Sequence, residues 1–119
     1  MSLITNEQRE QLLKQGKFNT FRRDRGEFEI DFKPVVKLFC PWGGGTWLLS
    51  ELDPDDPDIA FGLCDLGFGF PELGSVSIEE LESVTGPFGL TIERDLHFIA
   101  VKSLGEYAEE ARAFERIVS

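Results

Sequence analysis

The sequence predicts an α+β fold in which a mainly antiparallel sheet is combined with three helices. The helix starts are indicated by a Ser or Thr followed three positions later by Gln or Glu, which is the capping-box pattern. These pairs are Thr5 and Gln8, Ser77 and Glu80, and Ser103 and Glu106. Between the first two pairs, β-rich runs are separated by connections too short for parallel crossovers. With 119 residues, 41% of them hydrophobic, we expect residues 1–119 to form a single domain.

The N-terminal part is expected to contain a short helix followed by an edge strand. The helix begins after Thr5 and continues to about Lys14, with Gly16 as its C-terminal stop. In residues 28–32, three apolar side chains alternate with charged ones, which is the period of a half-exposed strand. Pro34 would end this strand, because proline supplies no backbone donor for a sheet.

The centre of the sheet is expected to consist of three strands. Residues 35–40 and 46–52 read as a hairpin, because the three glycines in the intervening PWGGG can adopt the positive φ of a tight turn. Residues 59–66 form the third strand, after a connector at residues 53–58 with the sequence DPDDPD. We interpret that connector as a solvated loop that its prolines hold extended.

The C-terminal half is expected to hold two helices and one or two further strands. The brief middle helix turns Ile78 and Leu81 inward, and the strands lie within residues 90–101. The last helix has apolar residues at three- and four-residue intervals, which predicts one face packed against the sheet. These residues are Leu104, Tyr107, Ala108, Ala111, Phe114 and Val118.

Charge is unevenly distributed along the chain. No Lys or Arg occurs between Lys37 and Arg94, and this stretch carries eleven carboxylates, whereas the rest has twelve basic and eleven acidic residues (−11 + 1 = −10). Such a balance argues against direct binding to a double-stranded DNA backbone and predicts a basic protein partner. The candidate partner-binding residues are Glu51, Asp53, Asp55, Asp56, Asp58 and Glu72.

The four aspartates of residues 53–58 permit several interpretations. A calcium-binding loop of the EF-hand type is excluded as a pattern, because its glycine is missing and Cys64 occupies the place of its last ligand. On an extended chain, their charge density approaches that of one nucleic-acid strand, so mimicry of nucleic acid is physically feasible. A divalent-ion site and an acidic surface for a partner also remain open.

A divalent-ion-dependent nuclease acting on single-stranded or branched DNA is the alternative function. Carboxylates near strands can hold Mg²⁺ for phosphodiester hydrolysis, and the metal candidates are Asp65, Asp95 and His97. However, no Lys occurs between residues 38 and 101, as a restriction-enzyme-like core would need, and His97 is the only histidine. The sequence implies no cofactor.

The N-terminal residues, the apolar stretches and the two cysteines indicate where the protein is located and whether its thiols are free. The start of the chain has no export signal, and no stretch is apolar enough to span a membrane, so we expect a cytoplasmic protein that does not bind membranes. Cys40 and Cys64 lie in apolar runs and are expected to be buried free thiols.

Four motifs carry a resemblance to a known family. They are KLF-x-PWG, TWLL-x-ELDP, D-x-AFGLCDLG and PELG, and the similarity extends over nearly the whole chain. The sequence resembles a small bacterial family known as domain of unknown function 2958. The resemblance implies an association with plasmids and other mobile DNA, and it supplies no catalytic residues. The chain is therefore expected to be an accessory protein of mobile elements, without enzymatic activity, that binds a basic, nucleic-acid-handling protein.

Overall fold

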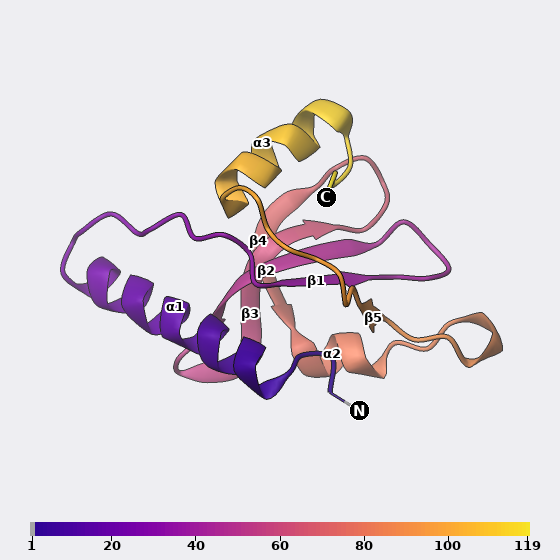
Figure 1. Ribbon diagram of the computed structural model, residues 1–119, viewed down its shortest axis with the longest axis horizontal. Helices are drawn as coiled ribbons and strands as arrows, with labels where there is room; N and C mark the ends of the chain where they lie inside the picture. Colours follow the sequence, from indigo (N-terminus) through magenta and orange to yellow (C-terminus); the bar gives the residue numbers. More distant parts are fainter. Residues whose placement is uncertain (1) are drawn as a thin grey trace.

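The computed structural model describes residues 2–119 and shows the predicted α+β architecture (Figure 1). One antiparallel sheet has the strand order β4-β3-β2-β1-β5. The strands are β1 (Val36–Phe39), β2 (Thr46–Asp53), β3 (Asp56–Asp65), β4 (Glu72–Ser77) and β5 (Glu93–Arg94). The helices are α1 (Asn6–Asp24), α2 (Ile78–Ser83), the 3₁₀ turn η1 (Pro87–Gly89) and α3 (Leu104–Phe114).

The N-terminal helix is longer than predicted. The capping box at Thr5 is present, but α1 continues through Gly16 to Asp24. A Cβ atom on Gly16 would lie 1.8 Å from the backbone oxygen of Leu52, so this glycine allows close packing of α1 against β2. The prediction that Gly16 ends the helix was therefore wrong, because the glycine serves tertiary contact instead of a C-cap.

The predicted strand at residues 28–32 is absent. After a turn at Arg25 and Gly26, residues 27–35 run without helix or strand from the end of α1 towards α3, and we call them the extended segment. The Asn19 side chain both donates to the Ile30 carbonyl (2.9 Å) and accepts from the Ile30 N–H (2.7 Å), in place of a neighbouring strand. Phe28 is 92% exposed, so the expected apolar face does not form.

The predicted hairpin is confirmed, but its glycines act differently from the prediction. Val36 pairs with Leu49 and Phe39 with Thr46. None of residues 43–45 has a positive φ. A Cβ on Gly44 would lie 3.0 Å from the Cα of Gly67, so Gly44 permits contact between the β1–β2 loop and the loop after β3.

The acidic connector is a tight turn and not an extended loop. Asp53 pairs with Asp56 across β2 and β3, and only residues 54 and 55 form the turn. β3 therefore begins earlier than predicted, and β4, which the sequence analysis missed, pairs with it along six residues. Glu72 and Ser77 are the ends of this additional strand.

The C-terminal half agrees with the prediction in its helices more than in its strands. Ile78 and Leu81 of α2 are buried, and the capping box of Ser103 and Glu106 begins α3. Only β5, two residues long, forms within residues 90–101. The predicted apolar face of α3 is buried at its first four positions but not at the last two, since Glu115 adopts the left-handed conformation that ends the helix. Phe114 is 60% exposed and Val118 lies beyond the helix.

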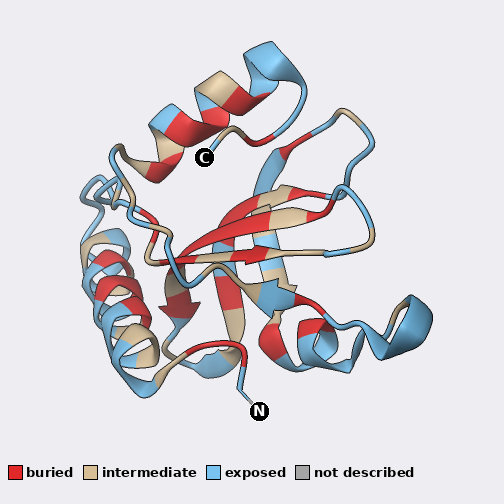
Figure 2. Cartoon of the chain, turned by 45° about the vertical axis from the view of Figure 1, so that its right-hand side comes forward, coloured by how far each residue is buried: buried red, intermediate tan, exposed pale blue. Residues whose placement is uncertain are grey.

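Each face of the sheet has its own apolar core, because successive strand residues point to opposite sides. Trp47 and Leu49 of β2 pack in the cluster that includes residues of α1 and α2, whereas Leu48 packs with Leu63 against α3. Figure 2 shows buried residues concentrated on the strands and on the inward sides of the helices. No helix within residues 2–119 has the length and apolar character needed to cross a bilayer.

Candidate functional site

A cleft of about 550 Å³ lies between α1 and the hairpin of β2 and β3, and we call it the α1–hairpin cleft. Its position follows from how α1 is fixed to the sheet. Gly16 contacts the Leu52 backbone, and Gln15 donates a hydrogen bond to the Ser50 carbonyl at 2.7 Å. The last turns of α1 therefore extend beyond this contact and form one wall of the cleft, while the β2–β3 turn forms another. The lining residues are Gly16, Thr20, Arg23, Asp24, Glu29, residues 51–55, Ile59, Phe61 and Ser75.

The cleft is strongly negative. Five carboxylates line it (Asp24, Glu29, Glu51, Asp53 and Asp55) against the single guanidinium of Arg23, which gives a formal charge of −4 (−5 + 1). Ile59 and Phe61 add apolar surface to the same lining, whereas the side chain of Leu52 is fully buried in the core. The side chain of Phe61 is 37% exposed. The cleft therefore combines negative charge with apolar surface, which suits a long side chain that has an apolar stem and a cationic end.

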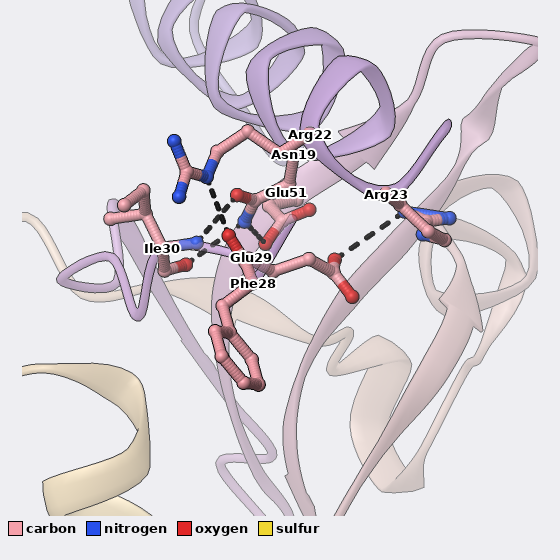
Figure 3. Close-up of polar contacts among 7 residues, drawn as sticks. All are labelled: Asn19, Arg22, Arg23, Phe28, Glu29, Ile30 and Glu51. Carbon is pink, nitrogen blue, oxygen red and sulfur yellow. Dashed lines mark hydrogen bonds and ion pairs between the residues drawn. The ribbon is translucent and has the colours of Figure 1, made fainter. Parts of the chain in front are cut away.

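Glu51 is the most constrained carboxylate of the cleft. Its Oε2 accepts a hydrogen bond from the Asn19 Nδ2 at 2.8 Å, and the same amide bonds the backbone of Ile30 (Figure 3). Burial raises the pKa of Glu51 above its usual value, an effect that the hydrogen bond from Asn19 opposes and the nearby Glu29 reinforces. A half-buried carboxylate of this kind gains from a cation beside it, because the cation favours the charged form.

Arg23 and Glu29 form an ion pair across the mouth of the cleft. Their Nη2 and Oε1 atoms are 3.4 Å apart, and both side chains are about half exposed (57% and 49%). Figure 3 shows Arg23 reaching from α1 towards Glu29 on the extended segment. An exposed pair of this type contributes at most about 1 kcal/mol, so a competing cation can replace Arg23 at small cost.

The structure brings only part of the predicted partner-binding set together. Glu51, Asp53 and Asp55 line the cleft, and Asp56 is exposed on the strand that pairs with Asp53. Asp58 has a different role. Its carboxylate accepts hydrogen bonds from the Ser77 hydroxyl and from the Glu79 N–H, at the start of α2. These bonds, the one from Ser77 first, lower the pKa of Asp58.

Glu72 lies away from the other predicted residues. It pairs with Cys64, eight positions along β3 from the acidic turn at Asp56. At ~3.3 Å per strand residue, the two sites are roughly 26 Å apart along the sheet. The predicted acidic surface is thus divided between the two ends of the sheet.

Asp65, Asp95 and His97 are not assembled into a metal site. Asp65 is 3% exposed, and its two oxygens accept from the N–H groups of Gly67 (2.8 Å) and Ile117 (3.0 Å). Asp95 accepts from the N–H of His97 and forms an ion pair with Lys37 at 3.7 Å. Asp95 and His97 lie at a turn, although strands were predicted within residues 90–101. Throughout residues 2–119, no three His, Cys, Asp or Glu side chains are grouped as metal ligands would be.

The two cysteines are free, and each is half-buried where full burial was expected. Burial raises the pKa of the Cys64 thiol, which disfavours the reactive thiolate. Among the aromatic residues near the acidic stretch, Trp47 is buried, whereas Phe68 and Phe70 are 78% and 79% exposed.

Sequence reasoning missed Glu29 and Phe61, which line the cleft, and Asn19, which bonds the cleft residue Glu51. An Asn within a helix is a weak signal, because its amide disfavours the helix interior unless it bonds elsewhere. Here the Asn19 amide bonds Glu51 and Ile30, two groups distant in sequence. Glu29 and Phe61 gave no local signal, since they enter the cleft only through the path of the extended segment and the register of β3.

Comparison with known proteins places the chain in one family. No curated protein and no solved structure matches the sequence. The family model described as protein of unknown function (DUF2958) matches residues 3–118. The match covers nearly the whole chain, including every strand and helix that forms the cleft. The chain therefore belongs to the DUF2958 family.

Proposed function

We propose that this chain is a non-enzymatic accessory protein whose α1–hairpin cleft binds a basic segment of a partner protein. The observation that carries the proposal is the formal charge of −4 on a cleft that also has apolar walls. A Lys or Arg side chain can place its stem against Ile59 and Phe61 and its charge among the carboxylates. Complementary potentials of this kind increase association rates and select partners by charge.

The affinity must come from several contacts together. One exposed ion pair contributes about 0.2–1 kcal/mol, so a single carboxylate cannot hold a partner. The half-buried Glu51, with its raised pKa, gains more from a neighbouring cation than the exposed Asp53 or Asp55 does. We therefore expect recognition to centre on Glu51, with Asp53 and Asp55 as the outer contacts.

Neither nucleic-acid mimicry nor nuclease activity is favoured by a specific observation. The mimicry argument required four aspartates along an extended chain, whereas the turn folds Asp53 back against Asp56. The nuclease argument required Asp65 near Asp95 and His97, and Asp65 instead bonds two backbone N–H groups. The partner we propose is a cytoplasmic protein that handles nucleic acid in mobile DNA, because such proteins carry basic surfaces.

Affinity capture with matched variants tests this function. The cleft variant carries Glu51→Gln, Asp53→Asn and Asp55→Asn, where the amide oxygens keep the hydrogen bonds that Glu51 accepts from Asn19 and Asp53 accepts within the turn. The control variant carries Glu10→Gln, Glu72→Gln and Glu109→Gln, which are exposed residues outside the cleft lining. Each variant changes the net charge from −10 to −7 (−10 + 3).

The proposal predicts that basic proteins are retained by the wild type and by the control variant but lost from the cleft variant. The wild type should also lose these basic proteins when the salt concentration is raised, because salt screens the attraction between exposed charges. Equal loss from both variants would show that net charge, and not the cleft, binds these proteins. Full retention by the cleft variant would show that the cleft is not needed. Either result would contradict the proposal.

A further inference from the structure

The loop between α2 and β5 contains an aromatic residue in a conformation that glycine or asparagine usually adopts. Phe88 has φ 58° and ψ 24°, Gly89 has φ 75°, and the Pro87 carbonyl accepts a hydrogen bond from the Leu90 N–H at 3.1 Å. These angles define a type I′ turn, whose first central position strongly prefers Asn, Asp or Gly. A bulky residue in the left-handed region is a genuine outlier.

Packing of the Phe88 side chain does not compensate for this strain. The Phe88 side chain is 102% exposed, so it packs against no other part of the protein. Strained residues persist where the surrounding structure fixes them, and they concentrate at functional sites. Phe88 holds its ring in solvent although its left-handed backbone conformation is unfavourable. This combination indicates that the ring contacts another molecule.

The base of the loop is rigid. The Gly86 N–H donates to the Leu90 carbonyl at 2.7 Å, and Thr85 pairs with Thr91. A Cβ on Gly86 would lie 2.4 Å from the Trp42 ring, so the loop backbone packs directly on that indole. Phe88 is thus presented on a fixed support, which reduces the entropy lost when a partner binds it.

The loop projects from the body of the protein on the side away from α1. In Figure 1 it extends beyond β5 at the right of the view, whereas α1 lies at the left, and Figure 2 shows it exposed throughout its outer part. The loop is therefore distinct from the α1–hairpin cleft, and its role does not depend on that of the cleft.

Charge restricts the kind of partner. Exposed Glu79 and Glu80 on α2 and Glu93 on β5 flank the loop in sequence, and no Lys or Arg occurs from residue 38 to residue 93. A membrane with anionic lipids would be repelled by these carboxylates. A second copy of the chain, with the same net charge of −10, would be repelled as well.

We propose that Phe88 is the anchor of a second protein-docking surface and inserts into an apolar pocket, rimmed by Lys or Arg, on a partner protein. Central aromatic residues that fill a pocket commonly dominate protein–protein affinity. The glutamates of α2 and β5 that flank the loop in sequence then orient the complex through attraction to the basic rim of that pocket.

Site-specific photo-crosslinking in a bacterium that naturally carries this sequence tests the proposal. The probe is p-benzoylphenylalanine at position 88 of the full chain, and the control is the same probe at position 28, where Phe28 is 92% exposed. The expected result is a protein adduct formed from position 88 and not from position 28. The crosslinked peptide of the captured protein should border an apolar pocket with basic residues at its edge.

The purified captured protein then provides the decisive binding comparison. Phe88→Asn should weaken its binding at least about tenfold, whereas Phe28→Asn should leave it within about twofold. Phe88→Asn should also raise the Tm by about 3–6 °C, because asparagine relieves the left-handed strain. Weaker binding therefore cannot result from unfolding.

Several outcomes would overturn the proposal. These are the absence of an adduct at position 88, equal adducts from both positions, and undiminished binding by Phe88→Asn. A covalent dimer formed by the purified chain alone would identify a second copy as the occupant instead. Flotation of the purified chain with vesicles of phosphatidylcholine and phosphatidylglycerol, abolished by Phe88→Asn, would identify a membrane.

Discussion

Several polar side chains of this protein stabilise backbone groups that lie outside regular helices and strands. Asp65 binds the N–H of Ile117 and so fixes the C-terminal segment, Asp58 binds the start of α2, and Asn19 binds Ile30. None of these partners is close in sequence, so the sequence alone cannot show that these side chains already have hydrogen-bond partners. In the structure, their carboxylate and amide groups bond backbone groups of the protein itself.

Removing the buried carboxylate of Asp65 should destabilise the protein. We expect Asp65→Ala to lower the free energy of unfolding by about 2–3 kcal/mol, because two N–H groups lose a charged acceptor. Asp55→Ala, at an exposed position, should change it by less than about 0.5 kcal/mol. Urea denaturation measures both values, and equal effects would contradict the structural role of Asp65.

Glu51 should make stability depend on pH. Since its pKa is raised in the folded state, the unfolded chain ionises first, and this group disfavours folding as pH rises above about its ordinary value of 4.5. The stability of Glu51→Gln relative to wild type should therefore increase from pH 4.5 upward and become constant above the folded pKa. Urea titrations over this range provide the measurement, and a difference independent of pH would refute the assignment.

At the scale of elements, α1 and β2 depend on one close contact. Gly16 lets the helix lie against the Leu52 backbone, and the cleft exists because α1 continues beyond that point. The sequence could not distinguish a glycine that ends a helix from one that permits packing, since both occur after an amphipathic turn.

Gly16→Ala should destabilise the protein although alanine favours helices by about 1 kcal/mol. The added methyl would meet the Leu52 oxygen, so the net loss should be at least about 2 kcal/mol. Gly74→Ala is the matched control, because a Cβ there meets nothing within 4 Å. Thermal melting of both variants tests the contact, which an unchanged or higher Tm for Gly16→Ala would exclude.

Elements with local signals were predictable, and those set by distant contacts were not. Capping boxes correctly predicted the starts of α1 and α3, and β-rich runs on either side of a glycine-rich turn predicted β1 and β2. The alternation of apolar and charged residues was misleading at residues 28–32, where the Asn19 amide takes the place of a neighbouring strand. β4 was missed because ELGSVS combines glycine with small polar residues, which have weak strand propensity.

The net negative charge of the molecule lies in residues 38–93, from the end of β1 to the start of β5, because this stretch holds eleven carboxylates and no Lys or Arg. The sequence did not show that Glu72 lies at the opposite end of the sheet from the acidic turn, because that separation depends on the register of β3 and β4. It also could not show the cleft, whose walls come from four separate segments.

Salt should stabilise the protein by screening this charge. We expect NaCl and MgCl₂ at matched ionic strength to raise the Tm equally, because screening does not distinguish ions that have no specific site. Parallel melts in EDTA, NaCl, MgCl₂, MnCl₂ and CaCl₂ provide the test. A larger rise in Tm with one divalent ion than with the other salts would show a specific ion site. It would contradict this prediction and favour the nuclease alternative.

The most direct test of the central claim is an NMR titration of the ¹⁵N-labelled protein with a peptide of alternating Arg and Gly, at about 0.15 M NaCl. If the α1–hairpin cleft binds basic segments, backbone amide signals of Thr20, Glu51, Asp53 and Phe61 should shift together and saturate. Signals of Glu72 and Glu109, exposed outside the cleft, should remain unchanged. Shifts spread evenly over all acidic residues, or centred at Glu72, would contradict the claim.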